Sequence, residues 1–179
     1  MTSLTVRRLL LAALAMVCIG AEDGSLIAGP AGAVPGSRTV QVSGSGFDDV
    51  AAAIVHWQRP TPTGTIQQST EVVELFGDLR GRVLYHVTSV VDLANGTLVN
   101  TGNQVFSGTI AGSQPVMLHD DQFRFEVNLV SGSESGRVLL VDHIAGPKVR
   151  CALDVVGTGP NPDGNPTFSY SGECTFRGE

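Results

Sequence analysis

Two titratable side chains interrupt apolar, β-rich segments of this sequence. Glu74 lies between Val73 and Leu75, and His86 follows Tyr85. A carboxylate or an imidazole that points into a hydrophobic cavity could hold a ligand or transfer a proton, so Glu74 and His86 are the candidate catalytic residues. If they point outward instead, they are ordinary solvated groups, which is the simpler interpretation of the two.

Aromatic side chains supply the candidate walls of such a cavity. His56 and Trp57 are adjacent, and Trp57 is the only tryptophan of the chain. Tyr85 and Tyr170 lie within two further β-rich segments. Aromatic rings shape cavities for apolar ligands, so these four residues form the candidate ligand-binding set. For Trp57, the alternative is a tryptophan that simply fills the core.

The remaining histidines also stand beside carboxylates, in His119-Asp120-Asp121 and in Asp142-His143. Neither spacing would put several ligands on one metal ion, so we expect no metal site, and no motif calls for a cofactor. Asp120 and Asp121 fit a solvated turn. The sequence has no GxSxG motif, no phosphate-binding glycine loop and no Cys-His nucleophile pair, which sets aside the usual hydrolase and kinase classes.

The N-terminus has the features of a secretory signal peptide. Two arginines precede a short apolar run, residues 9–20, which is too short for a comfortable transmembrane helix. We expect a signal helix over residues 1–21, or to residue 33 if cleavage follows Ala31-Gly32-Ala33, and an exported mature protein that is secreted, periplasmic or held at the cell surface. An uncleaved membrane anchor is the alternative, and the sequence leaves open whether the twin-arginine route is used.

Cysteine usage agrees with export. Removal of the signal takes away Cys18 and leaves an even pair, Cys151 and Cys174, which we expect to form a disulfide. The segments around them, residues 148–156 and 167–176, read as antiparallel strands. Pairing the two cysteines also places two further pairs on the same face, Leu153 with Gly172 and Val155 with Tyr170.

The rest of the chain reads as short strands joined by tight turns, without an amphipathic helix after the signal. Asn95-Gly96 between apolar runs predicts a hairpin with a type I′ turn, and glycines in residues 76–81 predict another hairpin loop. Phe123, Phe125, Val127 and Leu129 alternate with polar residues, as in a half-buried strand. The expected strands cover residues 38–42, 50–58, 64–76, 82–92, 97–100 with 104–110, 116–119, 122–130, 137–145, 148–156 and 167–176.

Composition fits one all-β domain. The chain has 179 residues, of which 42% are hydrophobic, only 16% are charged and 22 are glycine. Its net charge of −6 argues against nucleic acid and anionic membranes as partners, because both require a basic face. We expect a flexible leader over residues 22–46 and, over residues 47–179, an antiparallel up-and-down barrel of about eight strands, since closure removes both sheet edges.

Three glycine-containing segments carry a resemblance to a known group. They are Phe76-Gly77-Asp78-Leu79 with Gly81, Phe106-Ser107-Gly108-Thr109-Ile110 with Gly112, and Gly157-Thr158-Gly159. Residues 65–176 resemble the small lipocalin-like barrels of allene oxide cyclase and the dirigent proteins. The resemblance implies either that a hydrophobic cavity guides cyclisation of a reactive intermediate or that there is no catalytic activity. No catalytic residue of this chain matches a motif of that group.

These observations predict an exported, disulfide-bridged barrel whose interior binds an apolar small molecule. In one version it is a cyclase or isomerase that confines the conformation of its substrate, with Glu74 or His86 placing charge. In the other it is a non-catalytic carrier, or a surface interaction module whose lumen is filled by side chains. An open lumen that contains Glu74 or His86 would favour ligand chemistry, whereas a packed lumen with both residues outside would remove that case.

Overall fold

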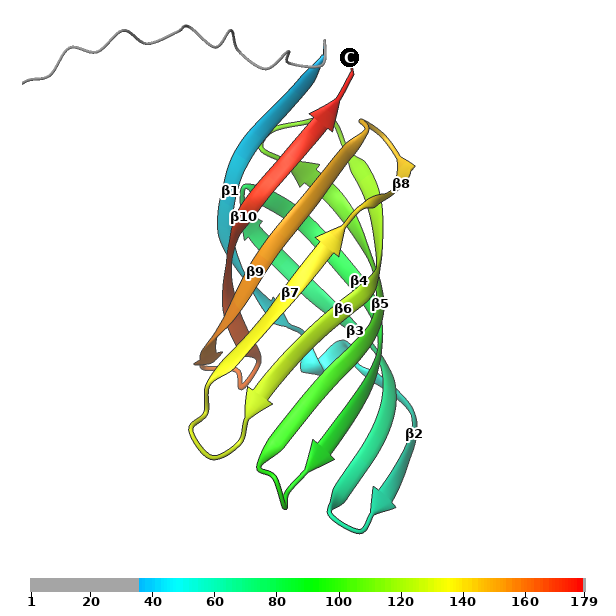
Figure 1. Ribbon diagram of the computed structural model, residues 1–179, viewed down its shortest axis with the longest axis vertical. Coiled ribbons are helices and arrows are strands. Elements are labelled where there is room, and N and C mark those ends of the chain that lie inside the picture. The colour runs from blue at the N-terminus through cyan, green and yellow to red at the C-terminus, as the bar shows by residue number, and fades with distance from the viewer. Residues whose placement is uncertain (1–35, 179) are drawn as a thin grey trace, which may run out of the picture. The chain divides into compact units, whose positions relative to one another are not determined.

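The computed structural model describes residues 36–178, which form ten strands and one short 3-10 helix (Figure 1). The predicted signal helix lies outside these residues. Within the described part of the chain, no helix is long and apolar enough to cross a membrane. The elements are β1 Ser37–Asp48, η1 Val50–Ala52, β2 Ile54–Thr61, β3 Gly64–Gly77, β4 Leu79–Asp92, β5 Thr97–Ile110, β6 Val116–Asn128, β7 Glu134–Leu140, β8 Asp142–Ala145, β9 Val149–Pro160 and β10 Pro166–Arg177.

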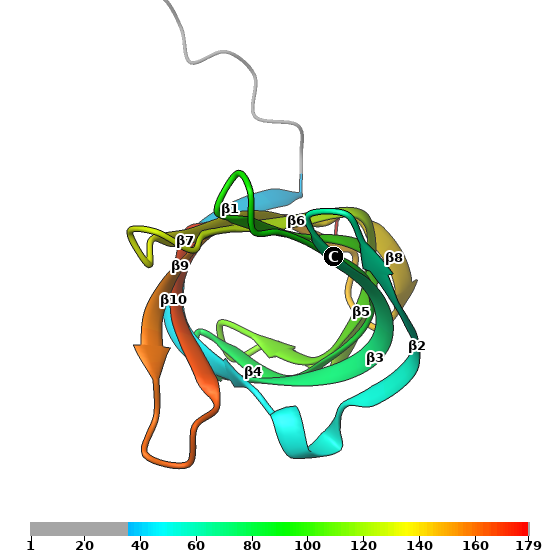
Figure 2. The ribbon, with the colours of Figure 1, turned by 90° about the horizontal axis from the view of Figure 1, so that it is seen from below.

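Eight of the strands close into an antiparallel barrel, which confirms the predicted fold class (Figure 2). The order is β1, β10, β9, β7, β6, β5, β4 and β3, and β1 then pairs with β3 to complete the ring. Sequential strands from β3 to β7 are neighbours, as in a meander. β8 pairs with β6, and β2 pairs with the part of β3 that β1 does not use.

The start of the barrel differs from the prediction. β1 runs from Ser37 to Asp48, well beyond the strand expected over residues 38–42 of the leader, and it pairs along its length with β10. The predicted strand over residues 50–58 is instead η1 followed by β2, of which every residue except Thr61 is exposed. The alternation of β1 is weak because serine and glycine occupy many of its positions. Its place in the ring depends on pairing with strands far away in the sequence.

The hairpin at Asn95-Gly96 is confirmed, but its turn is not type I′. Gly96 has a φ of 63°, whereas Ala111 is the one non-glycine residue with positive φ among residues 36–178. The Asp92 carboxylate instead accepts hydrogen bonds from the backbone N–H of Ala94, at 3.0 Å, and from the side-chain amide of Asn95, at 2.7 Å. Hydrogen bonds to the Asp92 side chain therefore stabilise this turn, in place of the two positive φ angles that a type I′ turn requires.

The predicted disulfide between Cys151 and Cys174 is confirmed, and both cysteines are buried. The register between β9 and β10 is also as predicted, with Leu153 opposite Gly172 and Val155 opposite Tyr170. These side chains lie on the inner face of the wall.

The lumen is filled at one end and hollow at the other. Near the turns that join β3 to β4 and β5 to β6, fully or almost fully buried side chains occupy the interior: Leu79, Phe106, Ile110, Val116, Leu118 and Val149. At the opposite end, Phe123, Phe125 and Val127 point into the barrel, as their alternation predicted, but they line open space. The two predicted alternatives, a packed and an open lumen, therefore each describe one half of this barrel.

Candidate functional site

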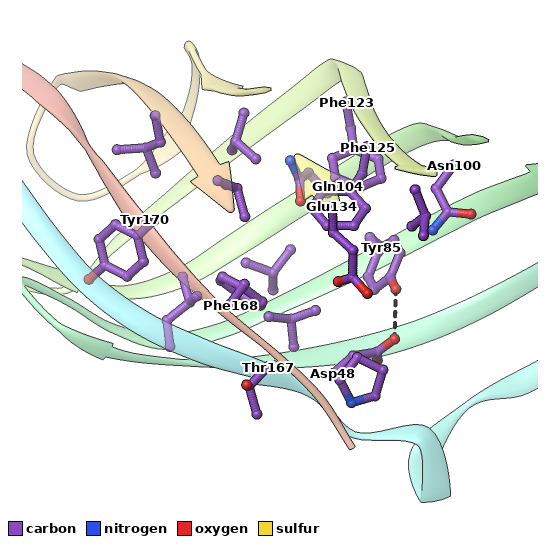
Figure 3. A pocket seen from close by; sticks show the side chains of 18 of the residues that line it. Asp48, Tyr85, Asn100, Gln104, Phe123, Phe125, Glu134, Thr167, Phe168 and Tyr170 are labelled. Carbon is purple, nitrogen blue, oxygen red and sulfur yellow. Dashed lines mark hydrogen bonds between the residues drawn. The ribbon is translucent and has the colours of Figure 1, made fainter. Parts of the chain in front are cut away.

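The hollow half contains a cavity of about 320 Å³. Its lining is mainly aliphatic and aromatic, and Figure 3 shows these side chains converging from strands around the ring. Polar groups are few: Asp48, Tyr85, Asn100, Gln104, Glu134, Thr167 and Tyr170. An apolar space with a small number of polar groups is the usual composition of a small-molecule site.

The polar centre of the cavity is the hydroxyl group of Tyr85. It lies 3.0 Å from Oδ2 of Asp48 and also makes a hydrogen bond with Oε2 of Glu71. The hydroxyl of Ser69 donates to the other oxygen of Glu71. Strands β1, β3 and β4 thus each contribute to one cluster, and the ring of Phe123 packs edge-on against Tyr85 with 5.6 Å between ring centroids.

This cluster has more acceptors than protons. A tyrosine hydroxyl donates one hydrogen bond, so Tyr85 cannot donate to Asp48 and Glu71 at the same time. Both contacts can be hydrogen bonds only if one of the two carboxyl groups is itself protonated and donates to the tyrosine oxygen. Burial, followed by the hydrogen bond and the negative charge of Glu71, raises the pKa of Asp48 to about 7. Asp48 is therefore the carboxyl group that takes up the proton.

The same environment keeps Tyr85 protonated. Burial, followed by the charges of Asp48 and Glu71, raises the pKa of Tyr85 far above its ordinary value. Tyr85 therefore acts as a hydrogen-bond donor and not as a phenolate. The site can hold a donor-bearing group or exchange a proton through Asp48 near neutral pH.

Two buried acceptors at the cavity have no partner. Oδ1 of Asp48 and Oδ1 of Asn100 are both inaccessible to solvent and make no hydrogen bond. Both residues line the cavity, Asp48 from the end of β1 and Asn100 from β5. Leaving such atoms unsatisfied costs about 1–3 kcal/mol each.

Behind the cavity, a buried carboxylate fixes the wall. Asp120 is completely buried within β6 and accepts hydrogen bonds from Nε2 of Gln104 and the backbone N–H of Leu139, both at 2.9 Å. The expectation of a solvated turn is therefore wrong for Asp120, whereas Asp121 is exposed but lies within β6. A bulge in the pairing of β5 with β6, between Gly102 and Gln104, lets Asp120 point inward and join β5, β6 and β7.

Of the predicted site residues, Tyr85 and Tyr170 line the cavity. Tyr170 is nevertheless largely structural, because its hydroxyl accepts from the backbone N–H of Leu79, at 2.8 Å, and lies 3.0 Å from the carbonyl of Phe76. Burial raises the pKa of Tyr170, so it remains a donor to this turn. It fastens β10 to the connection between β3 and β4.

The other predicted site residues lie on the outer face. Val73 and Leu75 point into the cavity, so Glu74 between them points outward, where it forms an ion pair with Arg82 at 2.6 Å. His86 is exposed beside the inward-pointing Tyr85. Of the two orientations left open by the sequence, the structure shows the solvated one for both Glu74 and His86.

His56 and Trp57 join this outer surface on β2. His56 and His86 each make a hydrogen bond with the hydroxyl of Thr70, at 2.8 and 2.7 Å. Trp57 is 37% exposed, and its indole N–H donates to Gln68. Trp57 therefore neither lines the cavity nor fills the core, because β2 lies outside the closed ring.

The remaining carboxylate-histidine pair also lies away from the cavity lining. His119 and Asp142 face each other across β6 and β8 with 3.5 Å between Nδ1 and Oδ2. Among residues 36–178, no group of three or more His, Cys, Asp or Glu side chains is placed to hold a metal ion.

Comparisons with known proteins give no match to a family model, to a curated protein or to a solved structure. The resemblance to allene oxide cyclase and dirigent barrels therefore stays a prediction.

Proposed function

We propose that this protein binds an apolar small molecule inside its barrel. The observation that carries the proposal is the 320 Å³ cavity with its mainly apolar lining. Its size falls within the range of small-molecule sites, which is about 300–1,000 Å³. Burial of apolar ligand surface there would contribute about 25 cal/mol per Å² before the costs of association.

We further propose that the protein acts outside the cytoplasm. The buried disulfide supports this location, because such bonds persist mainly in oxidising compartments. The predicted signal peptide leads to the same location from the sequence.

Two functions could use this cavity: that of a carrier, and that of a cyclase or isomerase that confines the conformation of its substrate. Binding alone requires only the cavity, and so the carrier is the function that the geometry supports best. A catalytic version would draw its proton transfer from Asp48 and Tyr85, since Glu74 and His86 point away from the lumen. Mass analysis of a bound ligand after incubation separates the two, because a carrier returns it unchanged.

Filling the cavity tests the proposal. Val138 lines the cavity, whereas Leu84 is 54% exposed on the outer face of β4. We expect the wild-type protein and Leu84→Phe to bind the neutral dye N-phenyl-1-naphthylamine, with enhanced fluorescence. We expect Val138→Phe to weaken binding about tenfold or more, a loss of about 1.4 kcal/mol. No binding by the wild-type protein, or equal binding by Val138→Phe, would contradict a lumenal site.

Native mass spectrometry of the purified protein, before and after organic extraction, gives an independent readout. A retained apolar molecule that extraction removes would identify the ligand directly. The mass would also show the two-hydrogen deficit of the disulfide and the N-terminus of the mature chain.

A further inference from the structure

The charges around the cavity are of one sign. Asp48 and Glu134 line it, and Glu71 lies directly behind the hydroxyl of Tyr85. None of the lining residues found in the described part of the chain is Lys, Arg or His. A ligand carboxylate or phosphate would therefore meet negative charge with no basic partner, in a space where water screens poorly.

The hydrogen-bonding groups have the same bias. Oδ1 of Asp48 and Oδ1 of Asn100 are acceptors without a donor, and the single proton of Tyr85 is shared between two carboxyl groups. What the cavity lacks is donors. An alkylammonium group has three N–H donors and a positive charge, so it supplies both missing features at once.

The positions of these groups suit an amphiphile that enters tail first. Asp48 ends β1 and Glu134 begins β7, so both lie toward the hollow end of the barrel. The inner part of the cavity is lined by aliphatic side chains, among them Leu75, Leu140 and Leu153. An apolar tail would contact these side chains while the polar end stays beside Asp48.

We propose that the ligand of this cavity is an apolar molecule ending in a protonated amine, which binds with its ammonium group between Asp48, Glu134 and Asn100. The proposal rests on the proposed lumenal binding function and specifies the chemical class of the ligand. It assigns Asp48 as the main counter-ion, because Asp48 lines the cavity beside the hydroxyl of Tyr85, whereas Glu71 contacts that hydroxyl without being a lining residue.

The choice of Asp48 predicts how binding depends on pH. Asp48 is faced by Glu71 on β3, Tyr85 on β4 and Glu134 across the cavity, and it adjoins Asp49 in the chain. Burial, followed by the hydrogen bond and negative charge of Glu71, raises the pKa of Asp48 to about 7, so the counter-ion is half charged at neutral pH. A primary amine with a pKa near that of lysine, about 10.4, remains charged throughout this range. Amine affinity should therefore rise between pH 5 and pH 8, and binding near pH 7 should release a proton.

Three probes of equal chain length test the proposal: decylamine, 1-decanol and decanoate, each competing with N-phenyl-1-naphthylamine below its micellar concentration. At pH 8 we expect decylamine to bind about tenfold or more tightly than 1-decanol, and decanoate to bind most weakly. We expect Asp48→Asn to remove the preference for decylamine over 1-decanol. The matched control is Glu74→Gln, which removes the same charge from the outer face and should retain the preference.

A second readout does not depend on the variants folding. Calorimetry of the wild-type protein near pH 7, in two buffers with different heats of ionisation, should show proton release on binding of decylamine and none on binding of 1-decanol. If decanoate or 1-decanol binds as tightly as decylamine while the dye still binds, the amine inference is wrong and lumenal binding stands. If neither the dye nor any probe binds, the proposed function itself fails.

Discussion

At the scale of single residues, the most consequential side chain is Asp48. It is an acid placed between a second acid and a phenol, at the edge of an apolar cavity. Its raised pKa means that the folded protein retains a proton that the unfolded chain loses near pH 4. As the pH rises from about 4 to about 7, the folded state therefore loses stability relative to the unfolded state, and the full cost is present above pH 7.

Asp48→Asn should remove this cost, because an amide carries no charge and can donate to Glu71. We expect the variant to be more stable than the wild-type protein at pH 8 by about 1 kcal/mol, well below the full value of the pKa shift since water reaches the cavity. The difference should shrink toward pH 4. Denaturant unfolding across this pH range measures it. Asp121→Asn on the exposed side of β6 is the control, and an equal pH response in both variants would contradict the assignment.

Sequence reasoning found Tyr85 but not its two carboxylate partners, for a physical reason. Val72 and Val73 lie between Glu71 and Glu74 and are both apolar, although neighbouring residues of a strand point to opposite faces. The alternation of polar and apolar residues therefore does not show which of the two acids points inward. The pairing of β3 with β1 and β4 decides it. Asp48 lies at the expected edge of the domain, beyond the strand predicted over residues 38–42, so no local pattern placed it in the barrel wall.

At the scale of the elements, the barrel closes where β1 crosses from β10 to β3. Gly44 pairs with Tyr170 on one side and with Gly77 on the other. A Cβ atom at Gly44 would collide with the carbonyl oxygen of Phe76 and with the hydroxyl of Tyr170. The closure therefore depends on the close approach of backbone to a tyrosine hydroxyl, which only glycine permits here.

Gly44→Ala should weaken this closure by about 1–3 kcal/mol, the usual cost of overpacking. We expect a lower denaturation midpoint and faster amide exchange in β1. Ser45→Ala, on the exposed face one residue later, should leave both nearly unchanged. Equal stability of the two variants would show that β1 can move away from β10 and β3 without a loss of folding free energy.

The disulfide between β9 and β10 is the second element-scale constraint. Replacing both cysteines, Cys151→Ser with Cys174→Ser, should reduce the free energy of unfolding by about 3 kcal/mol, mainly through a less restricted unfolded chain. Denaturant unfolding of the two proteins under oxidising conditions gives the difference. A loss below about 1 kcal/mol would mean that the pairing with β1 and β7 alone fixes these strands.

These two constraints also show what the sequence could predict. The register of β9 with β10 followed from two cysteines and a shared apolar face, because both are visible in the local pattern. The pairing of β1 with both β10 and β3 leaves no such pattern, since Ser43, Gly44, Ser45 and Gly46 are small or polar on both faces. A strand of this composition is defined by its neighbours.

At the scale of the whole molecule, the eight-strand barrel was predictable because a meander with one apolar face must close or leave exposed edges. How far its lumen is filled was not predictable. That depends on which inward positions carry large side chains once the strands are staggered around the ring. Here Phe106 and Leu118 fill one end, whereas Phe123, Phe125 and Phe168 line the other end without filling it.

Because one end of the lumen is packed with side chains, the barrel limits the length of the alkyl chain that it can bind. In a series of primary alkylamines, each added methylene should contribute up to about 0.8 kcal/mol until the tail meets the buried side chains, and nothing beyond that point. Leu140→Ala, at the inner limit of the cavity, should move the break to longer chains, whereas Leu84→Ala on the outer face should not. An affinity that rises without a break would mean that the tail leaves the barrel. With a break, the side chains that stabilise the fold also set the largest molecule that it accepts.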